Sequence, residues 1–273
     1  MSPARTARAL ARETITREIL DSARARLSTD GAAALSLRAV ARDVEMVSSA
    51  VYRYFPSRDA LLTALLVESY DELGEAAEAA DAAVADRADT GARWLATFRA
   101  VRAWCVAHPG EFGLLYGTPV PGYAAPRDTV VPAVRVVRVL ARIVGDAYAA
   151  GARPAAVPAP VAAATADAPV TVAPGLAFIA DQGLWAGTDL TGDDVAEAVR
   201  RTIIAWTTLF GLISFELFGH QVGSVADPVT WLDEVALRLG ADLGIGVRTQ
   251  HPGGPHPAPA RHAGEERSMH ATR

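Results

Sequence analysis

The chain has 273 residues, a formal net charge of −5 and a hydrophobic share of 51%. That share is enough to form a sizeable core, which excludes wholesale disorder, and no apolar run is long enough to span a membrane. The single cysteine, Cys105, excludes an internal disulfide framework and a cysteine-rich zinc site. Because no apolar leader follows Met1, we expect a cytoplasmic protein.

Charge is unevenly distributed along the chain. Residues 1–60 carry ten Arg against seven Asp and Glu, whereas the rest carries sixteen Arg against twenty-four acidic residues. This asymmetry indicates that the basic residues 1–60, rather than the whole acidic chain, contact an anionic partner.

The first helix is predicted over residues 14–28. Apolar side chains recur every four residues from Ile15 to Leu27, which places them on one helical face. Residues 1–12 are expected to form a disordered arm or the frayed start of this helix. The arginines of this arm are Arg5, Arg8 and Arg12. They form either a solvated tail or an arm for the phosphates or minor groove of a nucleic acid.

Two short helices follow. Apolar residues repeat with helical spacing in two consecutive stretches, which predicts helices over 36–44 and 47–55. Ser36 suits the N-cap of the first helix, and Pro56 ends the second. Such short helices with a tight turn between them are typical of a helix-turn-helix, and helix 14–28 would pack behind the pair.

The second helix of this pair has a polar side opposite its apolar side. Met46, Val51 and Phe55 form the side that we expect to be buried. The opposite side offers four side chains to the bases of a major groove: Ser48, Ser49, Tyr52 and Arg53. Three residues lie at the edges, where phosphates pass: Ser36, Tyr54 and Arg58. A helical hairpin with a purely structural role is the alternative interpretation.

The rest of the chain is also predicted to be helical. Ser57 caps a helix over 57–80, and the apolar pattern continues in later stretches. The further helices are predicted over 87–107, 111–116, 129–150, 176–186, 192–219 and 228–244. The Ala- and Pro-rich residues 151–174 are expected to form a loop. No strand-like period of two persists, so the expected fold class is all-α.

Three segments of the helix-turn-helix region carry a family resemblance. Residues 16–23 read Thr-Arg-Glu-Ile-Leu-Asp-Ser-Ala, residues 36–42 read Ser-Leu-Arg-Ala-Val-Ala-Arg, and residues 51–62 read Val-Tyr-Arg-Tyr-Phe-Pro-Ser-Arg-Asp-Ala-Leu-Leu. Together they resemble the N-terminal domain of the tetracycline-repressor (TetR) family over residues 12–70. The resemblance implies a dimeric, ligand-responsive transcriptional regulator, and it adds Arg38 to the residues that reach bases.

A weaker resemblance lies near the C-terminus. The segment from Ala205, which reads Ala-Trp-Thr-Thr-Leu-Phe-Gly, is similar to a subgroup whose C-terminal domain is marked by a Trp and a His-Gly pair, with Phe210-Gly211 here in place of His-Gly. This likeness implies that the last two helices form a four-helix dimer interface. The predicted interface residues are Trp206, Phe210, Ile213, Leu217, Trp231 and Val235. Glu216 either pairs with an arginine across this interface or points to solvent.

The predicted domain organisation follows from these likenesses. Residues 1–60 form a three-helix DNA-binding domain with its arm at 1–12. Residues 61–247 form a helical ligand-binding and dimerisation domain that includes the loop, and residues 248–273, which are rich in Pro, Gly and His, form a disordered tail.

Large aromatic side chains are numerous for an Ala-rich body. Each is individually typical of core, and together they indicate that some surround a cavity for a small ligand. The candidate pocket residues are Trp94, Phe98, Trp104, Phe112, Tyr116, Tyr148, Phe178 and Trp185. Cys105 is interpreted as a buried, inert thiol rather than a redox sensor. His108 is interpreted as a helix C-terminal residue rather than a ligand contact.

One residue departs from the family pattern. Glu45 occupies the turn position that the family usually gives to Gly, which adopts a positive φ without cost. Glu45 therefore implies either an ordinary φ or some strain, and it places a carboxylate near the nucleic-acid surface.

The family resemblance, together with the aromatic-rich body, implies a homodimeric repressor that a small apolar or amphipathic ligand releases from a palindromic operator in double-stranded DNA. No nucleophile elbow, phosphate-binding loop, dinucleotide fingerprint or helical His pair occurs, so neither an enzyme nor a cofactor or metal site is expected. Two alternatives stay open. One is a helical small-molecule-binding protein whose DNA binding is lost through Glu45, and the other is a helical enzyme with a vestigial N-terminal domain.

Overall fold

The computed structural model is all-helical in the residues that it describes, which are 3–165, 171–190 and 192–246. The N-terminal helices are α1 (Pro3–Asp30), α2 (Leu37–Asp43) and α3 (Ser48–Val51), and α4 (Arg58–Ala83) leads into the body. The body contains α5 (Thr90–Ala107), α6 (Pro109–Tyr116), α7 (Val130–Ala133), α8 (Arg135–Ala149), α9 (Ala159–Thr165), α10 (Ala173–Asp181), α11 (Gly192–Leu217) and α12 (Pro228–Asp242). The expected all-α fold class is confirmed. None of the described helices combines the length and the apolar character that crossing a membrane requires.

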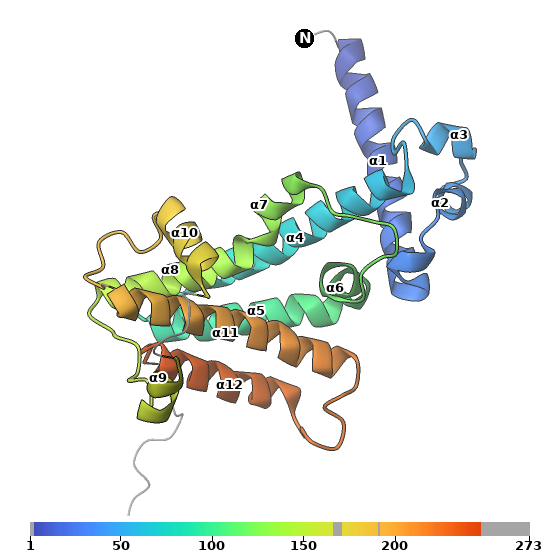
Figure 1. Cartoon of the computed structure of the whole chain (residues 1–273). Helices are drawn as coiled ribbons and strands as arrows, with labels where there is room; N and C mark the ends of the chain where they lie inside the picture. Colours follow the sequence, from blue (N-terminus) through green and yellow to red (C-terminus); the bar gives the residue numbers. More distant parts are fainter. Residues whose placement is uncertain (1–2, 166–170, 191, 247–273) are drawn as a thin grey trace, which may run out of the picture.

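The structure has two hydrophobic cores. The first core joins α1, α2, α3 and the beginning of α4, and its fully buried side chains include Ile19, Val40 and Val51. The second core joins the other end of α4 to the helices of the body, with Trp94 and Leu140 among its buried residues. Figure 1 shows α4 running from one group of helices into the other.

Side-chain caps define the ends of several helices. The Ser57 hydroxyl accepts a hydrogen bond from the Ala60 amide at 3.0 Å, as expected for the cap of α4. Asp227 accepts from the Val229 amide at 3.0 Å and precedes the proline that begins α12, which is the cap predicted from the sequence.

The N-terminal arm differs from the expectation. Residues 1–12 were expected to be disordered or frayed, yet α1 is helical from Pro3 onward. Its first turns are rich in Ala, Arg and Leu, which are strong helix formers. The packed turns from Ile19 supply the nucleus, so each added residue gains a hydrogen bond without a new nucleation cost.

Two other segments also differ. The predicted helix 129–150 is divided at Val134, where φ is −90° and ψ is 0°, into α7 and α8. The expected loop 151–174 contains α9 and the first residues of α10, because its alanines favour helix and because Pro160 and Pro174 fall in first turns, where no amide donor is needed. The tail predicted at 248–273 lies outside the described residues.

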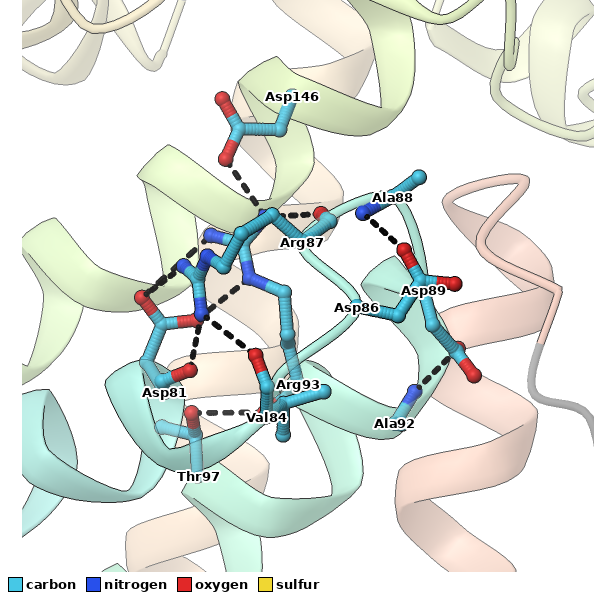
Figure 2. Close-up of polar contacts among 10 residues, drawn as sticks. All are labelled: Asp81, Val84, Asp86, Arg87, Ala88, Asp89, Ala92, Arg93, Thr97 and Asp146. Atoms are coloured by element: carbon cyan, nitrogen blue, oxygen red, sulfur yellow. Dashed lines mark hydrogen bonds and ion pairs between the residues drawn. The ribbon is translucent and has the colours of Figure 1, made fainter.

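A buried ion cluster holds the C-terminal end of α4 (Figure 2). Arg93 of α5 is 1% exposed and bonds Asp81 through Nε at 2.6 Å and Asp146 of α8 through Nη1 at 2.7 Å. Arg87 bonds the other oxygen of Asp81 at 2.8 Å. Burial raises the pKa of Asp81, but the hydrogen bonds from both arginines outweigh this effect and leave its pKa below the ordinary value.

Replacing Asp81 with Asn should lower the free energy of unfolding by ~3 kcal/mol, because the Arg93 charge stays buried without its main partner. Denaturant unfolding at pH 7 measures this loss. Asp146→Asn is the matched control, since its carboxylate faces the same arginine but is half exposed, and it should cost less than about 1 kcal/mol. Equal losses would contradict the prediction.

The same pair predicts a pH dependence. A carboxyl group with a lowered pKa stabilises the fold above its unfolded pKa, and this contribution is lost as the pH falls through the folded pKa. Below the ordinary value of 3.8, the unfolding free energy of the unmodified chain should therefore fall more steeply than that of Asp81→Asn. If the unfolding free energies of the unmodified chain and of Asp81→Asn fell in parallel with pH in this range, the prediction would be wrong.

Candidate nucleic-acid interface

Helices α2 and α3 form a compact pair joined by the turn at residues 44–47. The Val51 side chain is fully buried and fixes the inner side of α3 against the first core. The regular helix ends at Val51, but the Phe55 amide still bonds the Val51 carbonyl at 3.0 Å, so helical hydrogen bonding extends over most of the predicted range 47–55.

Glu45 has a φ of 53° and is the one non-glycine residue with positive φ among the described residues. Its turn is a Schellman motif, in which the Met46 amide bonds the Ala41 carbonyl at 2.9 Å and the Glu45 amide bonds the Arg42 carbonyl at 3.3 Å. Of the two outcomes expected from the sequence, strain is therefore the one observed. The turn forms both Schellman hydrogen bonds, but the left-handed backbone at Glu45 costs conformational free energy.

The outer side of α3 and its C-terminal extension is polar and accessible. Tyr52 is 45% exposed, Ser49 and Arg53 are also exposed, and Ser48 is half-buried. Val47, at the N-cap of α3, is 70% exposed beside them. Its exposure was not foreseen, because a lone valine in a turn has no periodic signal.

Residues far apart in the sequence meet at the start of α2. Ser36, Arg38 and Tyr52 line one surface hollow, together with Ser57 at the start of α4. Ser36 precedes α2, but its hydroxyl makes no capping hydrogen bond, so it is not committed to the helix. The structure thus brings the predicted edge residue Ser36 next to two predicted base-reading residues.

Arg58 behaves differently from the expectation of a phosphate contact. Its guanidinium donates to the carbonyls of Ala32, Ala33 and Leu35, each at 2.9 Å. The side chain is half-buried and holds the loop that leads into α2. The structure therefore gives Arg58 a positioning role.

Ion pairs fix the helix-turn-helix to its supports. Arg26 of α1 forms a bidentate pair with Asp43 at the end of α2, at 2.6 and 2.8 Å, and these bonds lower the pKa of Asp43. Arg24 of α1 bonds Glu68 at 3.0 Å and Glu72 at 2.5 Å on α4. Helix α2 is thus tied to α1, and α1 is tied to α4.

Family models match this region and the body separately. The model described as "Bacterial regulatory proteins, tetR family" matches residues 19–65, and the model "Tetracyclin repressor-like, C-terminal domain" matches residues 94–239. This chain belongs to the TetR family. Regulators of this family bind DNA as dimers through such a helix-turn-helix.

Curated relatives agree with this assignment. The HTH-type transcriptional regulator Rv1816 of Mycobacterium tuberculosis (strain ATCC 25618 / H37Rv) is 42% identical over 231 residues, which cover 80% of this chain and 87% of that protein. The regulator Mb1846 of Mycobacterium bovis matches to the same extent. The chain is therefore a TetR-family transcriptional regulator and not an enzyme.

Solved structures share the fold. The crystal structure of regulatory protein SCO4313 has a TM-score of 0.61 at 28% identity and covers 85% of this chain and 97% of its own. A protein of unknown function from Rhodococcus sp. RHA1 has a TM-score of 0.57 at 24% identity. The match covers 82% of this chain and 93% of that protein, and it bears on the fold alone.

The predicted pocket aromatics of this TetR-family body lie in its core. Trp94, Phe98, Phe112, Tyr148, Trp104 and Trp185 are buried, whereas Tyr116 and Phe178 are half-buried. The indole groups of Trp94 and Trp185 donate to main-chain carbonyls at 2.9 and 2.7 Å, which joins α5 to α12 and the turn after α10 to α8. The Tyr148 hydroxyl is buried and has no hydrogen-bond partner in the described part of the chain.

Cys105 and His108 follow the structural interpretations. Burial raises the pKa of the fully buried Cys105 thiol to about 12, which keeps it protonated near neutral pH and unreactive. His108 ends α5, where Nδ1 lies 2.8 Å from the Trp104 carbonyl oxygen and the ring stacks on Trp104.

Four of the six predicted dimer residues pack in or against the second core of their own chain. Ile213 is fully buried and Phe210 is 8% exposed, while Trp206 and Leu217 are half-buried against the second core. Trp231 and Val235 of α12 are also half-buried. Glu216 forms a bidentate pair with Arg102 of the same chain, so neither expectation for it holds.

A different side of α11 is exposed. Ile204 is 53% and Phe215 56% exposed, and the small residue Gly211 lies between them on the same side. We call Ile204, Gly211 and Phe215 the α11 stripe. Apolar residues occupy more than one side of α11, so periodicity alone did not indicate which side the body would cover.

Glu45→Gly should raise the free energy of unfolding by about 1 kcal/mol, because glycine adopts a φ of 53° without the Cβ clash. Glu45→Gln is the control that removes the carboxylate and keeps the Cβ, and it should leave stability near that of the unmodified chain. Denaturant unfolding measures both. A gain from Gln equal to that from Gly would assign the effect to charge instead of backbone.

Proposed function

We propose that this TetR-family regulator is a homodimeric repressor. Its two helix-turn-helix domains bind the half-sites of a palindromic operator, about one helical turn or a multiple apart. A small apolar or amphipathic ligand in the body releases it from that operator.

The observation that carries the DNA-binding role is the two-sided character of α3. Its inner side packs Val51 into the first core, while Ser49, Tyr52 and Arg53 stand on the outer side. In the proposed complex Arg53 reads guanine bidentately, Tyr52 contacts a thymine methyl or a phosphate, and Arg38 with Ser48 reaches neighbouring bases. Ser36 and Tyr54 bind phosphates at the edges.

Dimerisation is supported by the α11 stripe. Two large apolar side chains more than half exposed on one helix side favour burial against a second copy, and Gly211 allows the helices to approach closely. The proposed interface uses Ile204 and Phe215 in place of the buried Ile213.

Ligand release is supported by the position of α4. This helix contributes Leu61 and Leu65 to the first core and Leu73 and Ala77 to the second, so a body that repacks around a ligand displaces the DNA-binding domain. A ligand with differential affinity worth about 1–3 kcal/mol changes operator affinity about 5–150-fold.

The alternative of lost DNA binding is not favoured. It rests on Glu45, yet the turn forms with its Schellman hydrogen bonds intact despite the strained φ. Selection of duplexes from a random library by the full chain tests the choice directly. Recovery of one palindromic motif supports the regulator, and recovery of no motif contradicts it.

Arg53→Ala should cost about 1–3 kcal/mol per half-site on the selected duplex and relax base preference at one position. Fluorescence anisotropy at about 0.15 M salt with excess random duplex measures both effects. Arg142→Ala removes the same charge from the exposed surface of α8 and should leave affinity nearly unchanged. Unchanged base preference in Arg53→Ala would remove Arg53 from the reading surface.

Phe215→Glu should dissociate the dimer, because it would bury two unpaired carboxylates in the proposed contact. Light scattering coupled to sizing measures the mass. Val131→Glu, at a valine 67% exposed on α7, adds the same charge away from the stripe and should stay dimeric. A dimer that persists in Phe215→Glu would exclude the α11 stripe as the interface.

A further inference from the structure

Helix α1 extends beyond the domain that it supports. Its buried side chains begin at Ile19, whereas residues 6–14 are all exposed. Figure 1 shows this N-terminal part projecting past α2 and α3. The first core therefore holds only the second half of α1, and the first half is a helical projection with no core of its own.

The projection is basic. Residues 3–14 contain three arginines and one acidic residue, Glu13, in a chain whose net charge is −5. Arg8 and Arg12 occupy positions i and i+4, which share one side of a helix. We call these positions the α1 arginine row.

Contacts of Arg12 fix where the row lies. Its Nη2 donates to the Arg53 carbonyl at 3.4 Å, and its guanidinium carbon lies 5.0 Å from the centroid of the Tyr54 ring. The row thus begins beside the outer end of the candidate reading helix. Arg8 lies one turn, or about 6 Å, further out along α1.

Arg8 is available for a partner. Its side chain is exposed and makes no hydrogen bond or ion pair with the described residues. Arg24 and Arg26 of α1 differ, since they are committed to carboxylates of α4 and α2.

We propose that the α1 arginine row binds the phosphates of DNA that flanks each operator half-site. Arg12 positions the projection against the reading helix, and Arg8 meets the backbone beyond the base pairs that α3 contacts. The partner is DNA rather than an acidic protein because the row starts at Arg53 and Tyr54, on the same surface as the reading residues. This inference rests on the proposed function.

A preformed helix makes this contact efficient. An arm that is disordered before binding loses conformational entropy when it meets DNA. A projection that is already helical presents its arginines at fixed spacing, so less ordering accompanies binding. The contact is to phosphates, and so it adds affinity without adding sequence preference.

The test compares two duplexes that carry the motif recovered with the unmodified full chain. One duplex ends at the outer edges of the two half-sites, and the other adds about one helical turn of B-DNA on each side. Arg8→Gln is measured on both by anisotropy across a salt series. Arg142→Gln, at an exposed arginine on α8, is the matched control for net charge.

On the long duplex, Arg8→Gln should weaken binding and make the slope of log affinity against log salt shallower by about 0.9 per protomer. On the short duplex, the affinity and salt slope of Arg8→Gln should equal those of the unmodified chain. Arg142→Gln should equal the unmodified chain on both duplexes. Equal losses on both duplexes, or no loss on the long one, would overturn the proposal.

The flanking sequence provides a second readout. The loss caused by Arg8→Gln should be the same with A·T-rich and G·C-rich flanks, whereas a loss confined to A·T-rich flanks would indicate minor-groove binding and contradict a phosphate contact. Failure of the unmodified chain to select any motif would instead refute the proposed function, which keeps the two failures distinct.

Discussion

The architecture depends on one helix that belongs to two cores. Over its 26 residues α4 buries Leu61, Leu62 and Leu65 against the helix-turn-helix and Leu73 and Ala77 against the body. A rise of about 1.5 Å per residue makes this element about 39 Å long. Neither core can shift along or around α4 without disturbing packing in the other. The packing of the N-terminal domain is therefore coupled to the packing of the body.

Ion pairs reinforce that constraint along the length of α4. Arg24 of α1 holds Glu68 and Glu72, Arg135 at the start of α8 bonds Asp71 and Glu78, and the Arg93 cluster closes the far end at Asp81. Every cation is an arginine, whose planar fork satisfies two acceptors at once and tolerates burial better than an ammonium group does. These contacts hold α4 to α1, α5 and α8 along its length.

The two outward-facing features of the N-terminal domain have different proposed tasks. The outer side of α3 is proposed to discriminate bases, whereas the α1 arginine row is proposed to bind phosphates by charge alone. Arg12 links them through the Arg53 carbonyl and the Tyr54 ring. The strain at Glu45 lies in the turn between α2 and α3, and the hydrogen bonds on either side of it are retained.

The sequence by itself determined most of the helices, the helix-turn-helix and its inner side, because these depend on local periodicity, caps and breakers such as Ser57 and Pro56. It did not determine partners between distant segments. Whether Arg58 faces phosphate or the carbonyls before α2, whether Glu216 meets Arg102, and which side of α11 the body covers depend on packing between helices remote in the chain. The helical state of the first turns of α1 was also decided beyond the local pattern, since the packed second half of that helix nucleates the exposed first half.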